Sequence, residues 1–270
     1  MNALADLSQS RDLLVNLTLR ELRGKYKRSV LGWTWSLLNP LATMVIFSLV
    51  FGMLLKIKPA VGDPSGLINY PAFLLCGLLA WNFLSNAMNG SMVALLGNAG
   101  LIKKVYFPRQ VLIFATVLAL DWSFVIEMVL LVVFLLVLGN MVLPWLAGVV
   151  VAMVLLTIFA TGVGLILSML NVYFRDLQYL VGIGLQLWFY ATPIIYPIRL
   201  VNDSNAPQWL KDVYVLNPMV SFVGIFRALL YDLRFPAWGQ VAYVTVWSAA
   251  MFVIGMAVFR KFEPRLAEEL

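Results

Sequence analysis

Long apolar segments alternate with short polar ones along this chain. A membrane-spanning helix needs about 20 predominantly apolar residues, and six segments reach or approach that length: 34–55, 70–95, 111–138, 145–170, 179–198 and 239–259. The fifth segment is short and contains Pro193 and Pro197. A broken helix at membrane depth is tolerated only where its backbone is buried or lines a cavity. The pattern predicts an all-α polytopic membrane protein with six transmembrane helices.

The residues before the first span carry a second pattern, that of an amphipathic helix. On a helical wheel, one narrow arc holds apolar and aromatic positions: Val15, Leu19, Leu22, Tyr26, Val30 and Trp33. Several basic positions lie mostly outside that arc: Arg20, Arg23, Lys27 and Arg28. Such a helix lies on a membrane surface with its cations facing anionic headgroups, at about 1 kcal/mol per basic residue. We therefore expect an N-terminal amphipathic interface helix.

Two further stretches refine this plan. Residues 216–231, between the fifth and sixth spans, are too apolar for a solvated loop and too short to cross the bilayer. We expect a re-entrant helical pair there, with a lid lying on the outer leaflet as the alternative.

In the fourth span, Gly162 and Gly164 indicate close packing against neighbouring helices.

Composition and charge support a membrane protein and give it an orientation. Of the 270 residues, 62% are hydrophobic and 12% are charged, roughly half the charged fraction of a typical soluble domain. With the six spans, thirteen of the 19 Lys and Arg residues fall on the side of the two termini. The positive-inside rule then places both termini in the cytoplasm. The net charge of +6 is explained by this orientation, and we expect no nucleic-acid partner.

The chain lacks the residues that most membrane enzymes need. It has no histidine and a single cysteine, Cys76, which excludes a His-dependent catalytic triad, a Cys/His zinc site and a haem with a histidine ligand. It contains neither a G-x-x-x-x-G-K-[ST] motif for ATP nor the paired acidic motif DDxxD. We expect no catalytic residue, cofactor or metal in this chain. If the protein pumps a substrate, another polypeptide would supply the energy.

One loop has the composition of a docking site for a cytoplasmic partner. Residues 101–110, LIKKVYFPRQ, lie between the second and third spans. Three consecutive residues, Val105, Tyr106 and Phe107, would supply an apolar anchor, and a basic rim would surround it: Lys103, Lys104 and Arg109. A solvated positive loop is the alternative.

Two acidic residues, Asp121 and Glu127, interrupt the apolar third span. Each would cost about 3 kcal/mol at mid-bilayer if it faced lipid. They point about 120° apart on a helix, so they do not form a cooperating pair. The sequence leaves three roles open: a hydrogen-bonded or protonated carboxyl at a helix contact, the polar lining of a transport path, or a pair with an arginine such as Arg227.

Four segments together resemble the permease subunit of polysaccharide-exporting ABC transporters of the ABC-2 type, which include exporters of O-antigen, teichoic acid and cell-wall galactan. The segments are RELRGKYKRSVLGWTWSLLNP, LIKKVYFPRQ, NVYFRDLQYLVGIGLQLWFYATPIIYP and LNPM. The resemblance covers nearly the whole chain. It implies a single transmembrane domain, residues 1–270, with a cytoplasmic arm at 1–33, a six-span core at 34–259 and a cytoplasmic tail at 260–270.

The family also implies partners and a substrate. We expect a homodimer in the bacterial inner (plasma) membrane, bound to two cytoplasmic ATP-binding subunits that hold ATP and Mg, in contact with membrane lipids and moving an undecaprenyl-diphosphate-linked glycan outward. The loop at 101–110 would be the coupling helix. The lipid diphosphate would meet the interface helix at Arg20, Arg23, Lys27, Arg28 and Trp33. The channel would be lined by Phe47, Phe51, Gln186, Phe189, Tyr190 and Tyr196.

Three other functions fit parts of the sequence. An ABC-2 exporter of a drug or lipid would have a channel lined by aliphatic residues, whereas the fifth span presents an aromatic face with one amide, a combination that suits sugar rings. A membrane prenyl-phosphate glycosyltransferase would need acidic clusters and a sizeable loop for a nucleotide sugar. A structural scaffold would not explain the broken fifth span.

Overall fold

The computed structural model describes residues 11–26, 34–54, 56, 59, 61–203 and 207–269. Within these residues all regular secondary structure is helical, and there is no strand. In chain order the elements are α2 (Arg11–Tyr26), α3 (Trp35–Phe47), η2 (Ser48–Leu54), α4 (Tyr70–Gly97), α5 (Ala99–Lys104), α6 (Gln110–Val137), η3 (Leu143–Trp145), α7 (Leu146–Tyr173), α8 (Leu177–Tyr190), α9 (Arg199–Asn202), α10 (Gln208–Val215), α11 (Pro218–Arg227), η4 (Ala228–Asp232), α12 (Trp238–Phe262), η5 (Glu263–Arg265) and α13 (Leu266–Glu269). The all-α prediction is confirmed.

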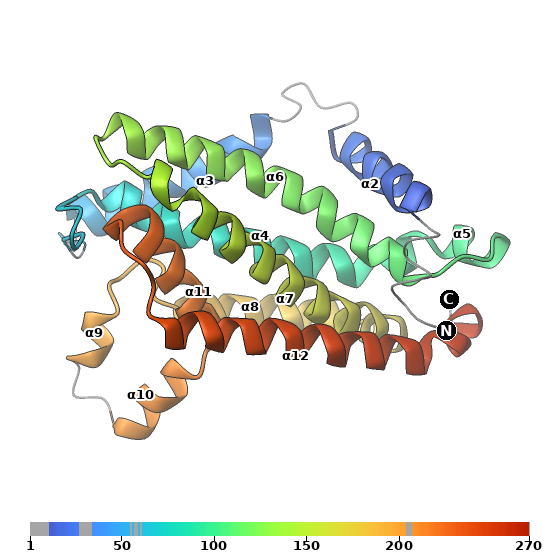
Figure 1. Ribbon diagram of the computed structural model, residues 1–270. Coiled ribbons are helices and arrows are strands. Elements are labelled where there is room, and N and C mark those ends of the chain that lie inside the picture. The colour runs from blue at the N-terminus through green and yellow to red at the C-terminus, as the bar shows by residue number, and fades with distance from the viewer. Residues whose placement is uncertain are drawn as a thin grey trace.

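Four helical segments within the described ranges are long and apolar enough to cross a membrane: Tyr70–Gly97, Gln110–Val137, Leu143–Tyr173 and Trp238–Arg265. They run lengthwise beside one another through the molecule (Figure 1). At 1.5 Å per residue, a 28-residue helix such as α4 is about 42 Å long, which exceeds the roughly 30 Å hydrocarbon core. These helices are the predicted second, third, fourth and sixth spans.

The predicted first and fifth spans look different. The first is helical from Trp35 to Leu54, as α3 followed by the π-helical η2. The fifth is helical only over the 14 residues of α8, about 21 Å, which is too short to cross the bilayer as one helix. The sequence predicted a broken helix here, and α8 ends at Tyr190, because Pro193 lacks an amide hydrogen and its ring clashes with the preceding turn.

The helix α7 packs closely between α4 and α12 because it carries glycines at both contacts. A Cβ on Gly255 of α12 would lie 2.3 Å from the carbonyl oxygen of Gly162. A Cβ on Gly164, on the other side, would lie 2.5 Å from the Ser91 hydroxyl of α4. The close packing predicted from Gly162 and Gly164 is confirmed.

The predicted re-entrant region, residues 216–231, contains α11 and η4. In α11 nearly every residue is buried, and the helix packs against α4, α7 and α12. Asn217 begins it by accepting a hydrogen bond from the amide of Met219, 3.0 Å away. The following η4 is also buried, from Ala228 to Tyr231. The predicted region is therefore mostly core, whereas the preceding α10, which lies outside it, leaves Trp209 and Val213 exposed.

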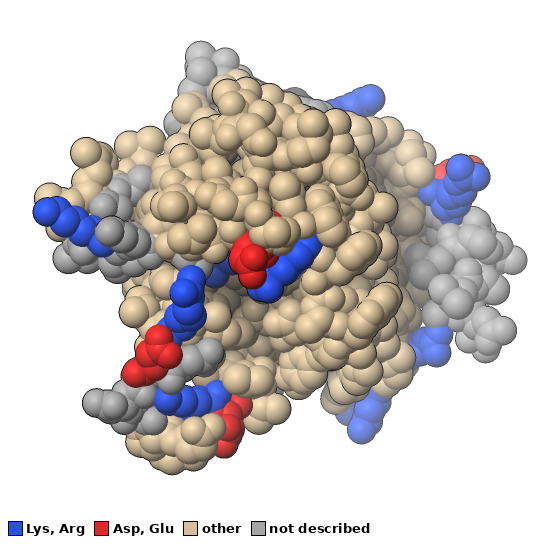
Figure 2. Space-filling view, turned by 60° about the vertical axis from the view of Figure 1, so that its left-hand side comes forward, with Lys and Arg blue, Asp and Glu red and all other residues tan. Residues whose placement is uncertain are grey.

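The two ends of the bundle carry different segments. The start of α2, α5 and α13 lie at one end, whereas α9 and α10 lie toward the other (Figure 1). Between the ends, valines of α6 and α7 are exposed, among them Val129 and Val150. Figure 2 shows that most of the surface in its view is uncharged, with the charged residues in small separate groups. An apolar surface of this extent suits contact with lipid.

Candidate functional site

A groove runs between α4 and α8 and holds three of the predicted channel residues. Its volume is about 290 Å³, and it is lined by Trp81, Ser85, Asn89, Gly182, Leu185, Gln186, Phe189 and Tyr190. The predicted residues in it are Gln186, Phe189 and Tyr190. The sequence analysis missed Trp81, Ser85 and Asn89, although their spacing of four residues places them on one face of a helix. The groove combines aromatic rings with amide and hydroxyl groups.

An aromatic cluster joins this groove to α3. The ring of Phe189 lies 5.7 Å from that of Trp81, 6.2 Å from that of Phe47 and 5.3 Å from that of Tyr190. Phe47 in turn meets Phe51 edge to face, with the ring centroids 5.6 Å apart. These distances are those of favourable aromatic pairs. This aromatic cluster next to Trp81 holds four of the six predicted channel residues: Phe47, Phe51, Phe189 and Tyr190.

The last predicted channel residue, Tyr196, lies beyond the end of α8. Its hydroxyl donates to the carbonyl oxygen of Tyr190, 2.6 Å away, and lies 3.1 Å from the hydroxyl of Tyr214 in α10. Burial raises the pKa of the Tyr214 phenol, so this side chain stays neutral at physiological pH. Tyr196 therefore holds the non-helical stretch against both α8 and α10.

The backbone carbonyls freed where α8 ends have side-chain partners. Asn217 donates to the carbonyl oxygen of Ala191 at 3.1 Å and accepts from the indole of Trp188 at 2.8 Å. Arg227 donates to the carbonyl oxygens of Pro193 and Ile194. This accounts for the broken helix, because irregular backbone at membrane depth must be satisfied within the protein.

Arg227 is buried, with 8% of its surface exposed. Its guanidinium also lies 3.7 Å from the centre of the Phe73 ring, a cation–π contact. Carbonyl dipoles and an aromatic face thus surround the charge. One alternative left open for the acidic residues of the third span was a pair with Arg227. For Asp121 the structure does not support it, since Arg227 is engaged by carbonyl oxygens at the break after α8.

Asp121 instead joins α6 to α7. Its carboxyl oxygen accepts a hydrogen bond from the Thr157 hydroxyl, 2.8 Å away. The pair lies on the wall of a cavity of about 650 Å³ between the two helices, lined otherwise by apolar side chains. Asp121 does not line the groove between α4 and α8. Of the three roles left open, the structure gives Asp121 the helix contact, while Glu127 is half-buried elsewhere on α6.

The predicted coupling loop is helical only from Ala99 to Lys104. Three of its predicted contact residues are exposed at the tip, Lys103, Lys104 and Val105, and Tyr106 is 96% exposed. Phe107 is 9% exposed and packs in the core, as does Ile102. The assignment of Phe107 to a partner-facing anchor was wrong, because this ring fixes the loop to the bundle.

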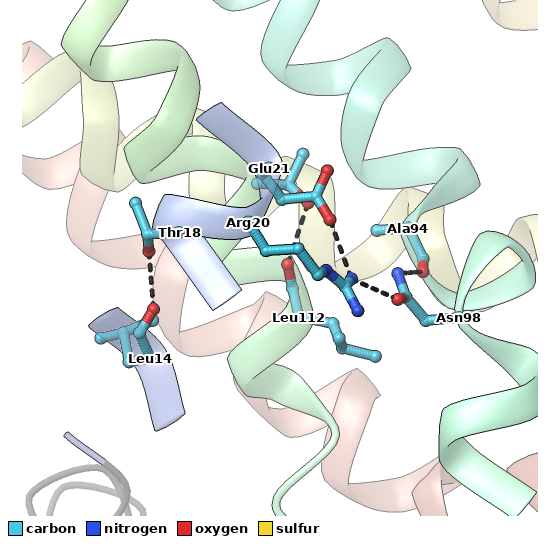
Figure 3. Close-up of polar contacts among 8 residues, drawn as sticks. Leu14, Thr18, Arg20, Glu21, Ala94, Asn98 and Leu112 are labelled. Atoms are coloured by element: carbon cyan, nitrogen blue, oxygen red, sulfur yellow. Dashed lines mark hydrogen bonds and ion pairs between the residues drawn. The ribbon is translucent and has the colours of Figure 1, made fainter. Parts of the chain in front are cut away.

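Both ends of the loop make polar contacts with distant parts of the chain. At its start, the guanidinium of Arg20 donates to the side-chain oxygen of Asn98 (Figure 3). At its end, the Arg109 amide donates to a carboxylate oxygen of Glu263, 3.3 Å away, and the Arg109 guanidinium donates to the Glu263 carbonyl oxygen. The loop is thus connected to α2 and to the end of α12.

The arm helix α2 packs on α6 through a face that the wheel analysis did not single out. Leu17 is buried, with Leu14 beside it, whereas Val15 and Leu19 are about half exposed. The predicted apolar arc therefore faces away from the bundle. The neighbouring leucines at positions 14 and 17 could have indicated the inner face. Arg23 is exposed, and three predicted residues lie outside the described ranges: Lys27, Arg28 and Trp33.

Comparison with known proteins places this architecture in a family. Residues 12–231 match the family described as ABC-2 type transporter. The O-antigen export system permease protein RfbA of Klebsiella pneumoniae is 32% identical over 262 residues, 96% of this chain and 95% of that protein. RfbA of Myxococcus xanthus is 34% identical over 256 residues, 91% of this chain and 92% of that protein. The polysialic acid transport protein KpsM of Escherichia coli is 26% identical over 259 residues, 92% of each chain. The chain therefore belongs to the ABC-2 type transporter family.

Proposed function

We propose that this chain is the permease subunit of an exporter that moves a polysaccharide out of the bacterial cytoplasm, driven by a separate ATP-binding subunit. The relatives that support this are export proteins for O-antigen and polysialic acid. The chain has no ATP-binding motif of its own. ATP and Mg would therefore be held by two cytoplasmic partner subunits, and the transport subunit itself would catalyse no reaction.

The groove between α4 and α8 is the observation that carries the proposal. Sugar rings present C–H faces that stack on aromatic rings such as Phe189 and Tyr190, and hydroxyl groups that amides such as Asn89 and Gln186 can bind. Many weak contacts of this kind hold a polymer without trapping it. A path lined only by aliphatic side chains would suit a drug or a lipid better.

A second copy of the chain would complete the path. The face of α8 away from the bundle exposes Leu180, Ile183 and Leu187, each at least 60% accessible. The helix α3 also exposes apolar side chains, including those of Val45 and Ile46. We propose that α3 with η2, and α8 with the stretch after it, are the remaining two spans of a six-span subunit and face the same elements of a second copy. The re-entrant segment predicted at 216–231 would be the buried α11 with η4, near the outer opening.

The orientation follows from the basic residues. The end with α2, α5 and α13 would face the cytoplasm, where Lys103, Lys104 and Tyr106 are exposed for the ATP-binding subunit. The arm would lie on the inner leaflet of the inner membrane. Among its described residues, Arg23 is exposed and could meet the diphosphate of an undecaprenyl-linked glycan.

The proposal is tested by ATP hydrolysis of the chain co-expressed with its ATP-binding subunit and placed in lipid nanodiscs. Undecaprenyl-diphosphate-linked glycan should stimulate hydrolysis, and phospholipid alone should not. A complex that ignores the glycan and responds to drugs or ordinary lipids would make the chain an exporter of those compounds.

Two aromatic residues provide a matched pair of variants for this assay. Tyr190 lines the groove, whereas Trp122 of α6 is 50% exposed outside it. Loss of one stacking contact in Tyr190→Leu should raise the glycan concentration for half-maximal stimulation about fivefold. Trp122→Leu should leave it unchanged. Equal effects of the two substitutions would remove the groove from the transport path.

A further inference from the structure

Asn98 stands between α4 and α5, where the chain leaves the bundle and enters the loop. Its side-chain nitrogen donates to the carbonyl oxygen of Ala94, 2.8 Å away, which directs its side-chain oxygen outward. That oxygen accepts from the guanidinium of Arg20 in α2, 78 residues earlier in the chain. Figure 3 shows Arg20 reaching from α2 to this junction. The amide is therefore held by α4 on one side and by the arm on the other.

A second contact fixes the direction of the Arg20 guanidinium. Its Nη2 atom lies 2.9 Å from a carboxylate oxygen of the adjacent Glu21. The two side chains are 48% and 37% exposed, so this ion pair contributes little to stability. The ion pair instead orients the Arg20 guanidinium toward Asn98, so that both Glu21 and Asn98 contact it.

The opposite end of the loop is fixed in a comparable way. Arg109 contacts Glu263 through both its backbone amide and its guanidinium. Between the two ends, Ile102 and Phe107 are buried and Tyr106 is exposed. A force applied at Tyr106 would therefore reach α2 through Asn98 and α12 through Glu263.

We propose that Arg20 is a positioning residue that ties the arm to the loop through Asn98, so that both move as one body when the ATP-binding subunit acts. This rests on the proposed function, in which the loop receives that subunit. It gives Arg20 a different role from Arg23 on the same helix. Arg20 acts through a specific amide, whereas Arg23 acts through its charge.

The first test measures the distance between α2 and α5 with spin labels at Val15→Cys and Gly100→Cys. Both positions are exposed, a Cβ at Gly100 meets nothing within 4 Å, and the native Cys76 is fully buried. In the complete complex in nanodiscs, Arg20→Met and Asn98→Ala should broaden the distance distribution. Asn98→Asp, which keeps an acceptor for Arg20, should preserve it, and so should Arg23→Met. A wild-type distance that changes when ATP binds would overturn the proposal, since the two elements would not move together.

The second test measures polysaccharide exported per ATP hydrolysed. Arg20→Met and Asn98→Ala should each lower this ratio about threefold, and the double variant should be no worse than either single variant. Asn98→Asp, which keeps an acceptor for Arg20, should keep the wild-type ratio. If Arg20→Met and Arg23→Met lower export equally with the α2 to α5 distance intact, Arg20 acts by charge alone and the proposal is wrong. If the distance broadens while the ratio stays normal, the contact is structural only and the proposal is again wrong.

The two measurements separate this inference from the function on which it rests. Failure of the glycan to stimulate the wild-type complex would count against the proposed function. The label distances would still show whether Arg20 and Asn98 hold the arm to the loop.

Discussion

Two consecutive helices, α7 and α8, are both apolar and yet are used in opposite ways. Half of the residues of α7 are buried, and its backbone touches α12 directly at Gly162. In α8 only Leu185 is buried, and the helix stops where the chain approaches Pro193. We call α4, α7 and α12 the frame, and α8 with residues 191–196 the wall. A transporter needs both, because a path can open only if one side moves while the other stays fixed.

The largest effect should come from separating two helices of the frame. In Gly255→Leu the new side chain would collide with backbone atoms of Gly162, which cannot move aside. We expect a loss of more than about 3 kcal/mol and little folded protein, measured as monodisperse yield and thermal unfolding in detergent. The control is Gly184→Leu in the wall, where a Cβ meets nothing within 4 Å. Similar yields from the two variants would contradict the distinction between frame and wall.

The loop between α4 and α6 shows a similar contrast at two neighbouring residues, because Phe107 packs in the core and Tyr106 is exposed. Phe107→Ser should destabilise the chain by about 3 kcal/mol, since it empties a buried site. Tyr106→Ser should leave the chain stable and weaken co-purification with the ATP-binding subunit. Thermal unfolding and pull-down of each variant measure the two effects separately. A stable Phe107→Ser chain that fails to bind its partner would return Phe107 to the docking surface.

The wall should respond to the loss of Arg227. Arg227→Met leaves the carbonyl oxygens of Pro193 and Ile194 without this donor, and we expect a loss of about 2 kcal/mol. The removal of a desolvated charge offsets part of that cost. Hydrogen exchange should increase in peptides covering 191–217 and stay constant in α7. Arg234→Met, at an exposed position, is the control. Faster exchange throughout the frame would show that Arg227 stabilises the whole bundle.

These differences explain which parts of the structure could be predicted. Continuous apolar length predicted the four long spans, and Gly162 predicted close packing, because both depend on local composition. The partner of Arg227 could not be predicted, because carbonyl oxygens at a helix break appear in no pattern of side chains. Phe107 was misassigned for a similar reason. An aromatic residue in a polar loop has the same sequence signature whether it points toward a partner or back into the core.

The smallest effect should come from Asp121, which lies at the contact between α6 and α7. Asp121→Asn keeps an oxygen that can accept the hydrogen bond from Thr157, and we expect stability to change by less than about 1 kcal/mol. Because this carboxyl does not line the groove between α4 and α8, export per ATP should also stay at the wild-type value. Asp121→Leu, which removes the acceptor, is the comparison, and its effect should appear in thermal unfolding alone. A strong loss of export in Asp121→Asn with unchanged stability would mean that the carboxyl has a role in transport, and that the moving part of the molecule reaches α6 as well as α8.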